Sequence, residues 1–268
     1  MLQTFPAVII TGGSSGIGKS FIEHVGKMHP DAVVFNLSRR IPAINVPGLK
    51  LHHWPCDLAN RAQTEKICES LSEALNREVP TGRILVINNS GFGTYGPFPE
   101  PNLDRQLEML EVNVCAPIQL VARLLPLLRA RGGAIMNIAS TAAFQPTGYL
   151  AAYGASKAFI LHWSLALGEE LRGSGVQVLA VCPGPTATQF FRNAGLRQSV
   201  VPDAIGQTAD EVVATALHAL ARGRTMVVSG WKNRLLAALS ARLPKPLAAR
   251  LAARVIARYR GTGGTKPA

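Results

Sequence analysis

Short apolar runs alternate with longer stretches of helical periodicity along most of the chain. Runs rich in β-branched and other apolar residues, typical of buried strands, lie at 7–11, 32–37, 51–54, 84–87, 134–139, 176–182 and 225–228. Apolar residues recur every three or four positions at 19–28, 61–76, 101–131, 151–172 and 209–221. Strands that alternate with helices form a parallel sheet with helices on both faces. The pattern therefore predicts a single doubly wound α/β domain.

Two stretches interrupt this alternation. Residues 41–50 contain Pro42, Pro47 and Gly48, so we expect a loop where a crossover helix would otherwise connect the second and third strands. The long helical region at 101–131 contains Pro117 and Pro126, which are expected to bend or divide it.

A third stretch, residues 185–208, has no periodicity. Its apolar side chains are Phe190, Phe191, Val200 and Val201. A long segment of this kind after the sixth strand is typical of a mobile lid, and its apolar residues favour an apolar substrate.

Length and composition fit one domain. A chain of 268 residues can bury a large core, and with 47% hydrophobic and 16% charged residues it is not expected to be disordered. The four cysteines have no C-x-x-C spacing and lie in or beside apolar segments, so we expect reduced, mostly buried thiols, which favours the cytoplasm. No signal peptide is expected from the first residues, and no uninterrupted apolar run approaches membrane-spanning length.

The formal net charge of +12 is concentrated late in the chain. Residues 1–211 hold 17 Lys and Arg against 16 Asp and Glu, whereas 212–268 hold 11 basic residues and no acidic one. A nearly neutral body argues against a nucleic-acid groove, so no nucleic-acid partner is expected. The basic tail suits a protein partner, a membrane surface or a solvated face.

The first apolar run leads directly into a glycine-rich segment that opens the first helix. Such a turn lets the backbone approach a pyrophosphate, which the free N–H groups and positive dipole end of the helix can bind. A tight turn without a ligand is the alternative, but the order of strand, loop and helix favours a Rossmann-type dinucleotide site. The predicted cofactor-binding residues here are Gly12, Ser14, Ser15, Gly16, Ile17 and Gly18.

The second strand ends in Ser38, Arg39 and Arg40, where an NAD-binding protein would carry an acid for the adenosine ribose. Arg39 could instead stack on adenine and pair with the 2′-phosphate of NADP, while Arg40 or Lys19 could add charge. The alternative is a pair of solvated loop arginines.

Polar residues also follow the third and fourth strands. Asp57, before Leu58, could accept a hydrogen bond from the adenine amino group or cap the helix that begins shortly after it. After the fourth strand, Asn88 and Asn89 could link adjacent strands through their amides, and Gly91 would leave room for a cofactor.

A further group of polar residues begins at the end of the fifth strand. Tyr153 and Lys157 are one helical turn apart, about 6 Å along the axis and on one face. A nearby ammonium favours the phenolate, so we expect it to bring the pKa of the tyrosine closer to neutrality, where general acid–base catalysis is efficient. Ser140 could converge with this pair at the carboxyl edge of the sheet. Taken alone, a Tyr and Lys pair is also common on ordinary helix surfaces.

Together these motifs resemble the motif set of the short-chain dehydrogenase/reductase family, over roughly residues 5–230. The matching positions are Thr11, Gly12, Gly16, Ile17, Gly18, Asn88, Asn89, Gly91, Asn113, Ser140, Tyr153, Lys157, Pro183 and Gly184. Two positions depart from the family pattern: Ser90 stands where alanine is more usual, and Thr186 where an aliphatic residue is frequent. Thr188 matches the usual threonine.

The resemblance implies roles for these residues. Tyr153 is expected to donate or remove the proton at the substrate oxygen, Ser140 to hydrogen-bond that oxygen, and Lys157 to perturb the tyrosine and bind the nicotinamide ribose. Asn113 is expected to hold a water that continues the proton path. Further cofactor contacts are expected from Arg39, Asp57, Leu58, Asn89, Pro183, Gly184, Thr186 and Thr188; no metal site is expected.

We therefore expect an NADP(H)-dependent oxidoreductase that transfers a hydride between nicotinamide and a carbonyl or secondary alcohol of a small apolar substrate, with reduction as the favoured direction. The alternatives are a 3-oxoacyl or hydroxysteroid-type lipid ketoreductase at a membrane surface, and a regulator that binds NADP without turnover. The family commonly pairs the helices corresponding to 101–131 and 151–172, so a homodimer or homotetramer is expected.

The end of the chain predicts two basic helices beyond the 1–230 domain. In the second, Leu247, Leu251 and Val255 recur every four residues beside a matching row of arginines, which predicts an amphipathic helix from Leu247 to Arg260. Residues 231–243 could form another before the prolines at 244 and 246. The extension, 231–268, either packs on the core or a second subunit, or docks on anionic lipid as part of a cytoplasmic, peripherally membrane-associated protein.

Overall fold

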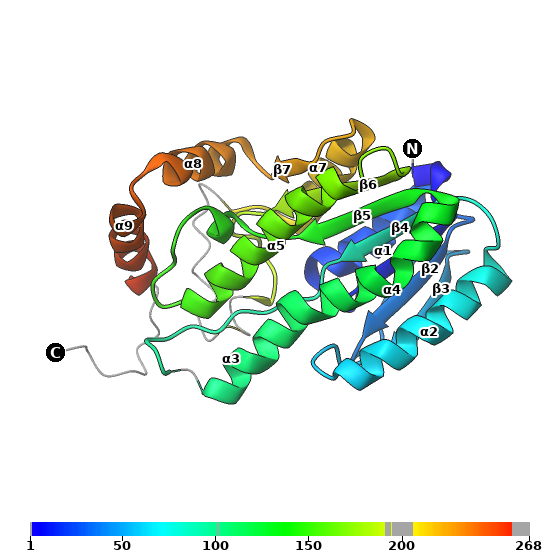
Figure 1. Ribbon diagram of the computed structural model, residues 1–268, viewed down its shortest axis with the longest axis horizontal. Coiled ribbons are helices and arrows are strands. Elements are labelled where there is room, and N and C mark those ends of the chain that lie inside the picture. Colours follow the sequence, from blue (N-terminus) through cyan, green and yellow to red (C-terminus); the bar gives the residue numbers. More distant parts are fainter. Residues whose placement is uncertain (1, 101, 191–193, 195–205, 259–268) are drawn as a thin grey trace.

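The computed structural model describes residues 2–100, 102–190, 194 and 206–258 (Figure 1). Its strands are β1 (Ala7–Thr11), β2 (Val33–Ser38), β3 (Lys50–Pro55), β4 (Ile84–Asn88), β5 (Gly133–Ile138), β6 (Val176–Cys182) and β7 (Met226–Val228). Its longer helices are α1 (Gly16–Met28), α2 (Arg61–Glu78), α3 (Leu103–Leu110), α4 (Ala116–Arg131), α5 (Ala151–Glu170), α7 (Ala209–Ala221), α8 (Trp231–Arg242) and α9 (Lys245–Ala257). Short turns of other helix types are η1 (Leu2–Thr4), η2 (Glu111–Cys115) and η3 (Thr141–Phe144).

The strands form one parallel sheet in the order β3-β2-β1-β4-β5-β6-β7. From β1 the chain moves outward to β3, then returns to the other side of β1 and moves outward again through β7. In such a sheet the crevice at the carboxyl ends of the strands, where the winding reverses, is the usual ligand site. The prediction of a doubly wound α/β domain is confirmed.

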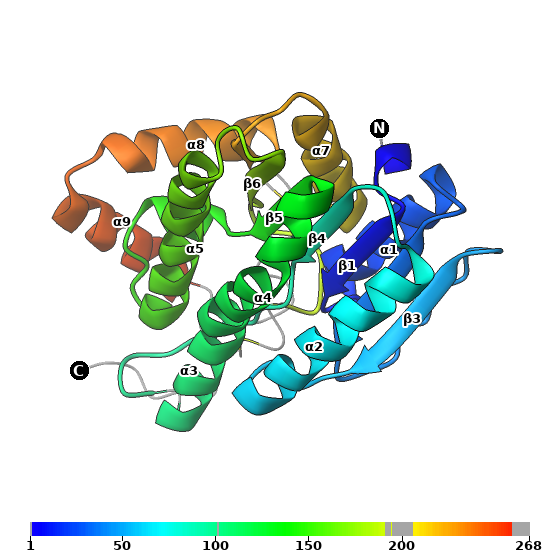
Figure 2. The same cartoon turned by 45° about the vertical axis from the view of Figure 1, so that its right-hand side comes forward.

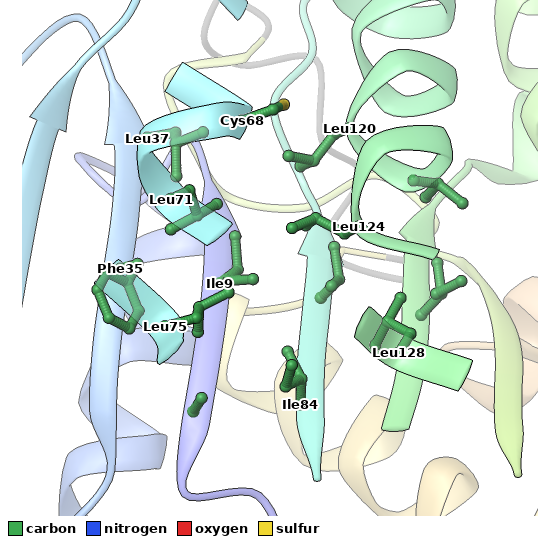
Figure 3. Close-up of a cluster of buried hydrophobic side chains, with 14 of the residues drawn as sticks. Ile9, Phe35, Leu37, Cys68, Leu71, Leu75, Ile84, Leu120, Leu124 and Leu128 are labelled. Atoms are coloured by element: carbon green, nitrogen blue, oxygen red, sulfur yellow. The ribbon is translucent and has the colours of Figure 1, made fainter. Parts of the chain in front are cut away.

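Helices cover both faces of the sheet because successive strand residues point to opposite sides. Ile9, Phe35 and the apolar side of α4 share one buried cluster, which Figure 3 shows with α2. Val8 and Ile10 point the other way, into a cluster with α1 and α7. Figures 1 and 2 show the corresponding layers, with α2, α4 and α5 on one face and α1 and α7 on the other. Continuous burial on both faces explains why the strand sequences are apolar throughout.

The connections agree with the sequence in one place and differ in another. The segment 39–49 between β2 and β3 contains no helix, as predicted. In the 101–131 region, however, neither proline ends the helix: Pro117 lies in the first turn of α4 and Pro126 within it. The region is divided instead by the π turn η2, because the hydrogen-bond ladder changes register there, just before the position where Pro117 lacks an N–H.

By length and composition, the 29-residue stretch Leu103–Arg131 could cross a membrane; the mean hydropathy of its most apolar 18-residue window is 1.3, and 33% of that window is buried. Arg123 interrupts its apolar sequence. The stretch packs on the protein itself: α4 contacts β4, β5 and α2, and α3 contacts α5. We therefore interpret it as a helix of the core layer.

The four cysteines are free thiols, as the sequence predicted. Cys56, Cys68 and Cys182 are buried and Cys115 is half-buried. Burial raises the pKa of the Cys182 thiol to about 12 and that of Cys68 to about 11. These thiols are therefore protonated at neutral pH.

The C-terminal helices lie beyond β7, at the left in Figure 1. Helix α8 contacts β7 and η3, and α9 is seated against the loop before α5, where a Cβ added to Gly148 would lie 2.7 Å from Ala253 Cβ. The leucines of the basic repeat do not complete the core, because Leu247 and Leu251 are exposed and only Ala248 of α9 is buried. The helix is described as far as Ala257, and Arg260 of the predicted helix lies outside the described residues.

Candidate active site

The carboxyl ends of the strands open into a cavity of about 480 Å³. Its wall comes from the loops after β1 to β6, from α3 and α5, and from Ile256 of α9. Of the residues predicted from the sequence, the wall contains Gly12, Ser14, Ser15, Gly16, Ile17, Arg39, Asp57, Leu58, Asn89, Ser140, Tyr153, Lys157, Pro183, Gly184, Thr186 and Thr188. Gly18 and Asn113 do not line the cavity but contact residues that do.

Close backbone contacts hold the glycine-rich loop between β1 and α1. Gly12 has a φ of 72° and Gly16 a φ of 55°, a region that favours glycine. A Cβ at Gly18 would overlap the carbonyl oxygen of Gly12, so the loop and the first turn of α1 can approach only with glycine there. Gly13 donates its N–H to Asn36 Oδ1 at 2.9 Å, which fastens the loop to β2.

The start of α1 is suited to an anion. Its N-cap residue, Ser15, makes no side-chain hydrogen bond to the helix start, so it does not occupy the N–H groups of the first turn. Such groups, with the positive end of the helix dipole, bind phosphate and pyrophosphate. Thr188 lies close to the loop, because a Cβ on Gly16 would be 3.1 Å from its Cγ2.

Two arginines meet at the end of the cavity beside β2 and α3. Nη1 of Arg39 lies 3.6 Å from Oε1 of Glu108. Arg105 pairs with the same carboxylate, and its guanidinium lies 3.9 Å from the centre of the Phe92 ring. The Arg39 side chain is 61% exposed, so its ion pair is weak and leaves the guanidinium able to bind a ligand.

Asp57 lies in the cavity wall but does not cap the following helix. Its Oδ1 accepts a hydrogen bond from Ala59 N at 3.1 Å. The N-cap of α2 is Asn60, whose side chain accepts from Gln63 N at 3.0 Å. The capping interpretation was therefore wrong, because the chain makes a further turn before the helix begins.

The asparagines at the end of β4 connect neighbouring elements, as predicted. Asn88 Nδ2 donates to Asn137 Oδ1 at 2.7 Å and so joins β4 to β5. Asn89 Nδ2 donates to the carbonyl oxygens of Thr11 and Gly12, at 3.0 and 3.2 Å. The amide of Asn89 therefore stabilises the glycine loop from the side of β4.

Ser140, Tyr153 and Lys157 come together at the carboxyl edge of the sheet. Ser140 lies two residues after the end of β5 and accepts a hydrogen bond from Ala142 N at 3.1 Å. The Ser140 side chain also acts on the Tyr153 hydroxyl, where it tends to lower the pKa of the tyrosine. Lys157 Nζ donates to the carbonyl oxygen of Ile138 at 2.8 Å. All three side chains line the cavity, and those of Tyr153 and Lys157 are otherwise buried.

Burial, rather than the neighbouring cation, controls the tyrosine. It raises the pKa of Tyr153 to about 12, although the hydrogen bond with Ser140 acts to lower it. Burial also lowers the pKa of Lys157 to about 8. The expectation that the ammonium brings the pKa of the tyrosine towards neutrality was wrong for this structure, because loss of water around the phenolate outweighs the other effects.

Asn113 lies in the π turn and has its amide fully engaged. Its Oδ1 accepts from Phe92 N at 3.1 Å, and its Nδ2 donates to Phe92 O at 3.0 Å and to Ser156 Oγ at 3.1 Å. A Cβ on Gly91 would lie 3.0 Å from Asn113 Oδ1 and 3.2 Å from Lys157 Nζ. Asn113 is thus next to the lysine, and it fixes the loop after β4 through both of its amide atoms.

The cavity wall also contains apolar side chains. Phe92, Leu150 and Ile256 are among them, together with the polar Gln145, Thr147 and Gln189, and the ring centre of Phe190 lies 5.1 Å from that of Tyr153. Phe190 belongs to the predicted lid, whose remaining apolar residues Phe191, Val200 and Val201 lie outside the described residues.

The loop after β6 is supported by the C-terminal extension. Thr186 Oγ1 donates to Gly184 O at 3.0 Å, and Pro183 O accepts from Thr141 N at 2.8 Å. A Cβ on Gly184 would overlap the side chain of Asn233 in α8. Asn233 is 3% exposed and donates to Ser229 O at 3.1 Å. A residue of the extension thus lies directly beneath a wall of the cavity.

Sequence reasoning missed Asn36, Arg105 and Asn233. Asn36 could have been found, because an amide within the apolar run of β2 needs buried partners. Arg105 and Asn233 gave no such signal, since the contacts that bring them to the site, with Phe92 and Gly184 respectively, join different elements of the fold. Within the described residues, no group of three or more His, Cys, Asp or Glu side chains is arranged to hold a metal ion.

A glycine loop at the switch point of a parallel sheet and a buried, hydrogen-bonded tyrosine beside it are features of oxidoreductases that bind a dinucleotide. The family model for short chain dehydrogenase matches residues 6–199. The chain therefore belongs to the short-chain dehydrogenase family, as its motifs indicated.

Individual relatives agree with this. The chain is 30% identical over 188 residues to the ketoacyl reductase HetN of Nostoc sp.; the match covers 68% of this chain and 63% of the relative. A short-chain dehydrogenase from Burkholderia cenocepacia in complex with NADP is 26% identical, with a TM-score of 0.77 over 94% of this chain and 99% of that one. A Sphingobium yanoikuyae short-chain dehydrogenase in complex with NADPH is also 26% identical, with a TM-score of 0.74 over 98% and 99%.

Proposed function

We propose that this protein is an NADP(H)-dependent reductase of apolar ketones or aldehydes, with Tyr153 as the general acid. The observation that carries the proposal is the position of Tyr153: it lines the cavity together with Ser140, which acts to lower its pKa, and its ring adjoins Phe190. One cavity thus brings together the glycine loop, Tyr153 and several apolar side chains.

The wall of the cavity fits NADP(H). The glycine loop and the start of α1 would hold the pyrophosphate, and Arg39 with Arg40 would face the 2′-phosphate. The loop after β2 brings two arginines to the wall and no acid that would bind free ribose hydroxyls. The two related structures in complex with NADP and NADPH support the same choice.

The bound cofactor would supply the hydride. Tyr153 and Ser140 would both donate hydrogen bonds to the substrate carbonyl oxygen, and the tyrosine would give up its proton as negative charge develops there. Lys157 would stabilise the phenolate left behind and bind the ribose next to the nicotinamide. Asn113, fixed beside Lys157, would hold a water on the path that returns a proton to the tyrosine.

The pKa of Tyr153 supports reduction as the main direction. A phenol with a pKa of about 12 is protonated at neutral pH and is ready to donate. Alcohol oxidation would need the phenolate, so it is expected to speed up as the pH rises. A regulator without turnover would have no need of a buried tyrosine bonded to a serine.

A lipid-type ketoreductase is the second candidate within this chemistry. The apolar residues Phe92, Leu150 and Ile256 favour a substrate with a hydrocarbon part, and a relative of this chain is a ketoacyl reductase. We further propose a homodimer or homotetramer in the cytoplasm. Helix α5 supports assembly, because its Phe159 side chain is exposed.

The test is NADPH consumption with a panel of ketones, aldehydes, hydroxysteroids and 3-oxoacyl thioesters, each measured with NADH in parallel. We expect turnover of apolar carbonyl compounds with NADPH, and little with short polar ones. Tight binding of NADPH without turnover of any compound in the panel would support the regulator instead.

A further inference from the structure

The outer side of the C-terminal helices carries a row of exposed apolar side chains. We call it the α8–α9 surface: Trp231, Leu235, Leu236, Leu239, Leu247, Leu251 and Val255. Trp231 is 70% exposed and the others 42–56%. Each helix turns its small or polar residues inward instead, Asn233 and Ala237 on α8 and Ala248 on α9. The outward position of the large apolar residues is therefore a property of both helices.

Cations flank this row on both helices. They are Lys232, Arg234, Arg242, Lys245, Arg250, Arg254 and Arg258, all exposed. In the described part of the chain none of the seven forms an ion pair with an acid, and residues 212–268 contain no acidic residue. Basic residues beside an apolar row are the pattern of helices that lie in the interface of an anionic membrane.

Charge decides between the possible occupants. A second copy would place seven cations against seven, and like charges across an interface are costly. Nucleic acid would pair with the arginines, but its phosphates would gain nothing from exposed Trp and Leu side chains. An anionic bilayer satisfies both sets at once, because headgroups pair with the cations while the apolar row enters the acyl boundary.

The inner side of α9 leads to the cavity. Ile256 lines the cavity together with Leu150 and Tyr153, while Val255, its neighbour in sequence, is exposed on the α8–α9 surface. Figure 1 shows α9 beyond the arrowheads of the central strands, at the edge of the sheet that carries the site. A bilayer beneath α9 would therefore lie next to the part of the cavity wall that Ile256 forms.

We propose that the α8–α9 surface docks the protein on anionic lipid bilayers and delivers bilayer-dissolved apolar substrate past α9 to the cavity. The delivery part rests on the proposed reductase function, whereas the docking part does not.

Docking is tested by flotation of the full-length protein, without cofactor or substrate, with phosphatidylcholine vesicles that contain or lack phosphatidylglycerol. We expect binding only to the anionic vesicles and release by high salt. Arg250→Gln with Arg254→Gln should lower the partition coefficient about thirtyfold, at the usual contribution of an arginine near an anionic surface. The matched control, Arg222→Gln with Arg224→Gln, removes the same charge from exposed positions after α7 and should change it less than about threefold.

A second pair tests the apolar row. Leu247→Ser with Leu251→Ser should lower binding at least about tenfold, whereas Leu103→Ser with Leu107→Ser, two exposed leucines at the same spacing on α3, should have little effect. Melting temperatures should be unchanged for both pairs, since all four side chains are exposed. A wild type that stays unbound, controls that lose binding equally, or a preference for duplex nucleic acid over vesicles would overturn the proposal. Loss of oligomeric mass in the Leu247 and Leu251 variant, without vesicle binding by the wild type, would assign the surface to a second copy.

Delivery is tested with a long-chain ketone in vesicles and a water-soluble ketone in buffer. The Arg250 and Arg254 variant should raise the KM for the vesicle ketone and leave kcat/KM for the soluble one unchanged. Equal KM values for wild type and variant would contradict delivery. Absence of turnover with either ketone would contradict the reductase function, while flotation would still decide docking.

Discussion

Tyr153 and Lys157 both lie away from water, and burial acts on them in opposite directions. The pKa of the Tyr153 phenol is raised to about 12, and the pKa of the Lys157 ammonium is lowered to about 8. Both shifts arise because the charged form loses hydration. The buried surroundings thus keep the proposed acid, Tyr153, protonated. The Lys157 ammonium donates a hydrogen bond to the carbonyl oxygen of Ile138.

The role of the tyrosine can be tested by removing one oxygen atom. Tyr153→Phe keeps the ring beside Phe190 and removes the proton donor, so kcat should fall at least about a hundredfold while NADPH binding is retained. Tyr149→Phe is the control, because that hydroxyl does not line the cavity. Near-normal turnover of the Tyr153 variant would exclude the assignment.

The lysine predicts a pH dependence of stability. Its pKa is depressed from 10.5 to about 8 on folding, so between these values the unfolded chain binds more protons and stability rises with pH. Below pH 8 Lys157 is protonated in both the folded and the unfolded chain, so the destabilisation by its buried charge has its full value. Relative to Lys157→Met, the unfolding free energy of the wild type should therefore rise by about 3 kcal/mol from pH 8 to pH 10.5. Denaturant titrations of both proteins measure this, and the comparison cancels the buried thiols, which act in the opposite direction above pH 9. If the difference in unfolding free energy between the two proteins does not change with pH, the pKa of Lys157 is not lowered in the folded protein.

Arg39 is the residue that tests cofactor choice. Arg39→Ala should lower the affinity for NADPH at least about tenfold and leave that for NADH almost unchanged. Only NADPH carries a 2′-phosphate, which would lose its charge-assisted hydrogen bonds to the arginine. Titrating both cofactors by fluorescence measures this, and NADH is the internal control. Equal weakening would make Arg39 a solvated loop residue.

At the scale of elements, the apolar periodicity of the sequence was enough to place the strands and helices to within a few residues, because strands buried on both faces must be apolar throughout. The exact place and type of the π turn at Glu111–Cys115 were not predictable, since Pro117 indicated only that the region would be bent or divided nearby. The contact of Asn233 with Gly184 was likewise not predictable, because it joins two segments that meet only in the folded protein. Contacts that the chain makes only after folding leave no periodic signal.

The contact of the glycine loop with β2 carries a prediction at this scale. A Cβ on Gly13 would overlap Asn36 Oδ1 and the side chain of Ile22. Gly13→Ala should therefore lower the free energy of unfolding by about 1–3 kcal/mol and lower the affinity for NADPH, because the loop must shift away from β2. Gly168→Ala is the matched control, since its Cβ would meet only Val178 at 3.6 Å. Thermal unfolding and cofactor titration of both variants test this; equal melting temperatures would show that the loop accommodates the methyl group.

At the scale of the whole molecule, the extension supports the domain that precedes it. A chain ending at Gly230 would lose Asn233 beneath Gly184 and Ala237 from the buried cluster with Val228. We expect a lower melting temperature and weaker NADPH binding, whereas a chain ending at Ala257 should match the full-length protein in both. Unchanged cofactor affinity of the shorter chain would show that the loop after β6 holds its shape alone.

The place of Asn233 also has a consequence for the order of events during synthesis. The glycine loop, Tyr153 and Pro183 all leave the ribosome before α8 does, yet the loop after β6 rests on a side chain of α8. A nascent chain can therefore form most of its sheet before the Asn233 side chain is in place against Gly184. The ability to bind the cofactor would then arise late, only once α8 has been synthesised and has docked, so that binding of NADPH would report that this part of the fold is complete.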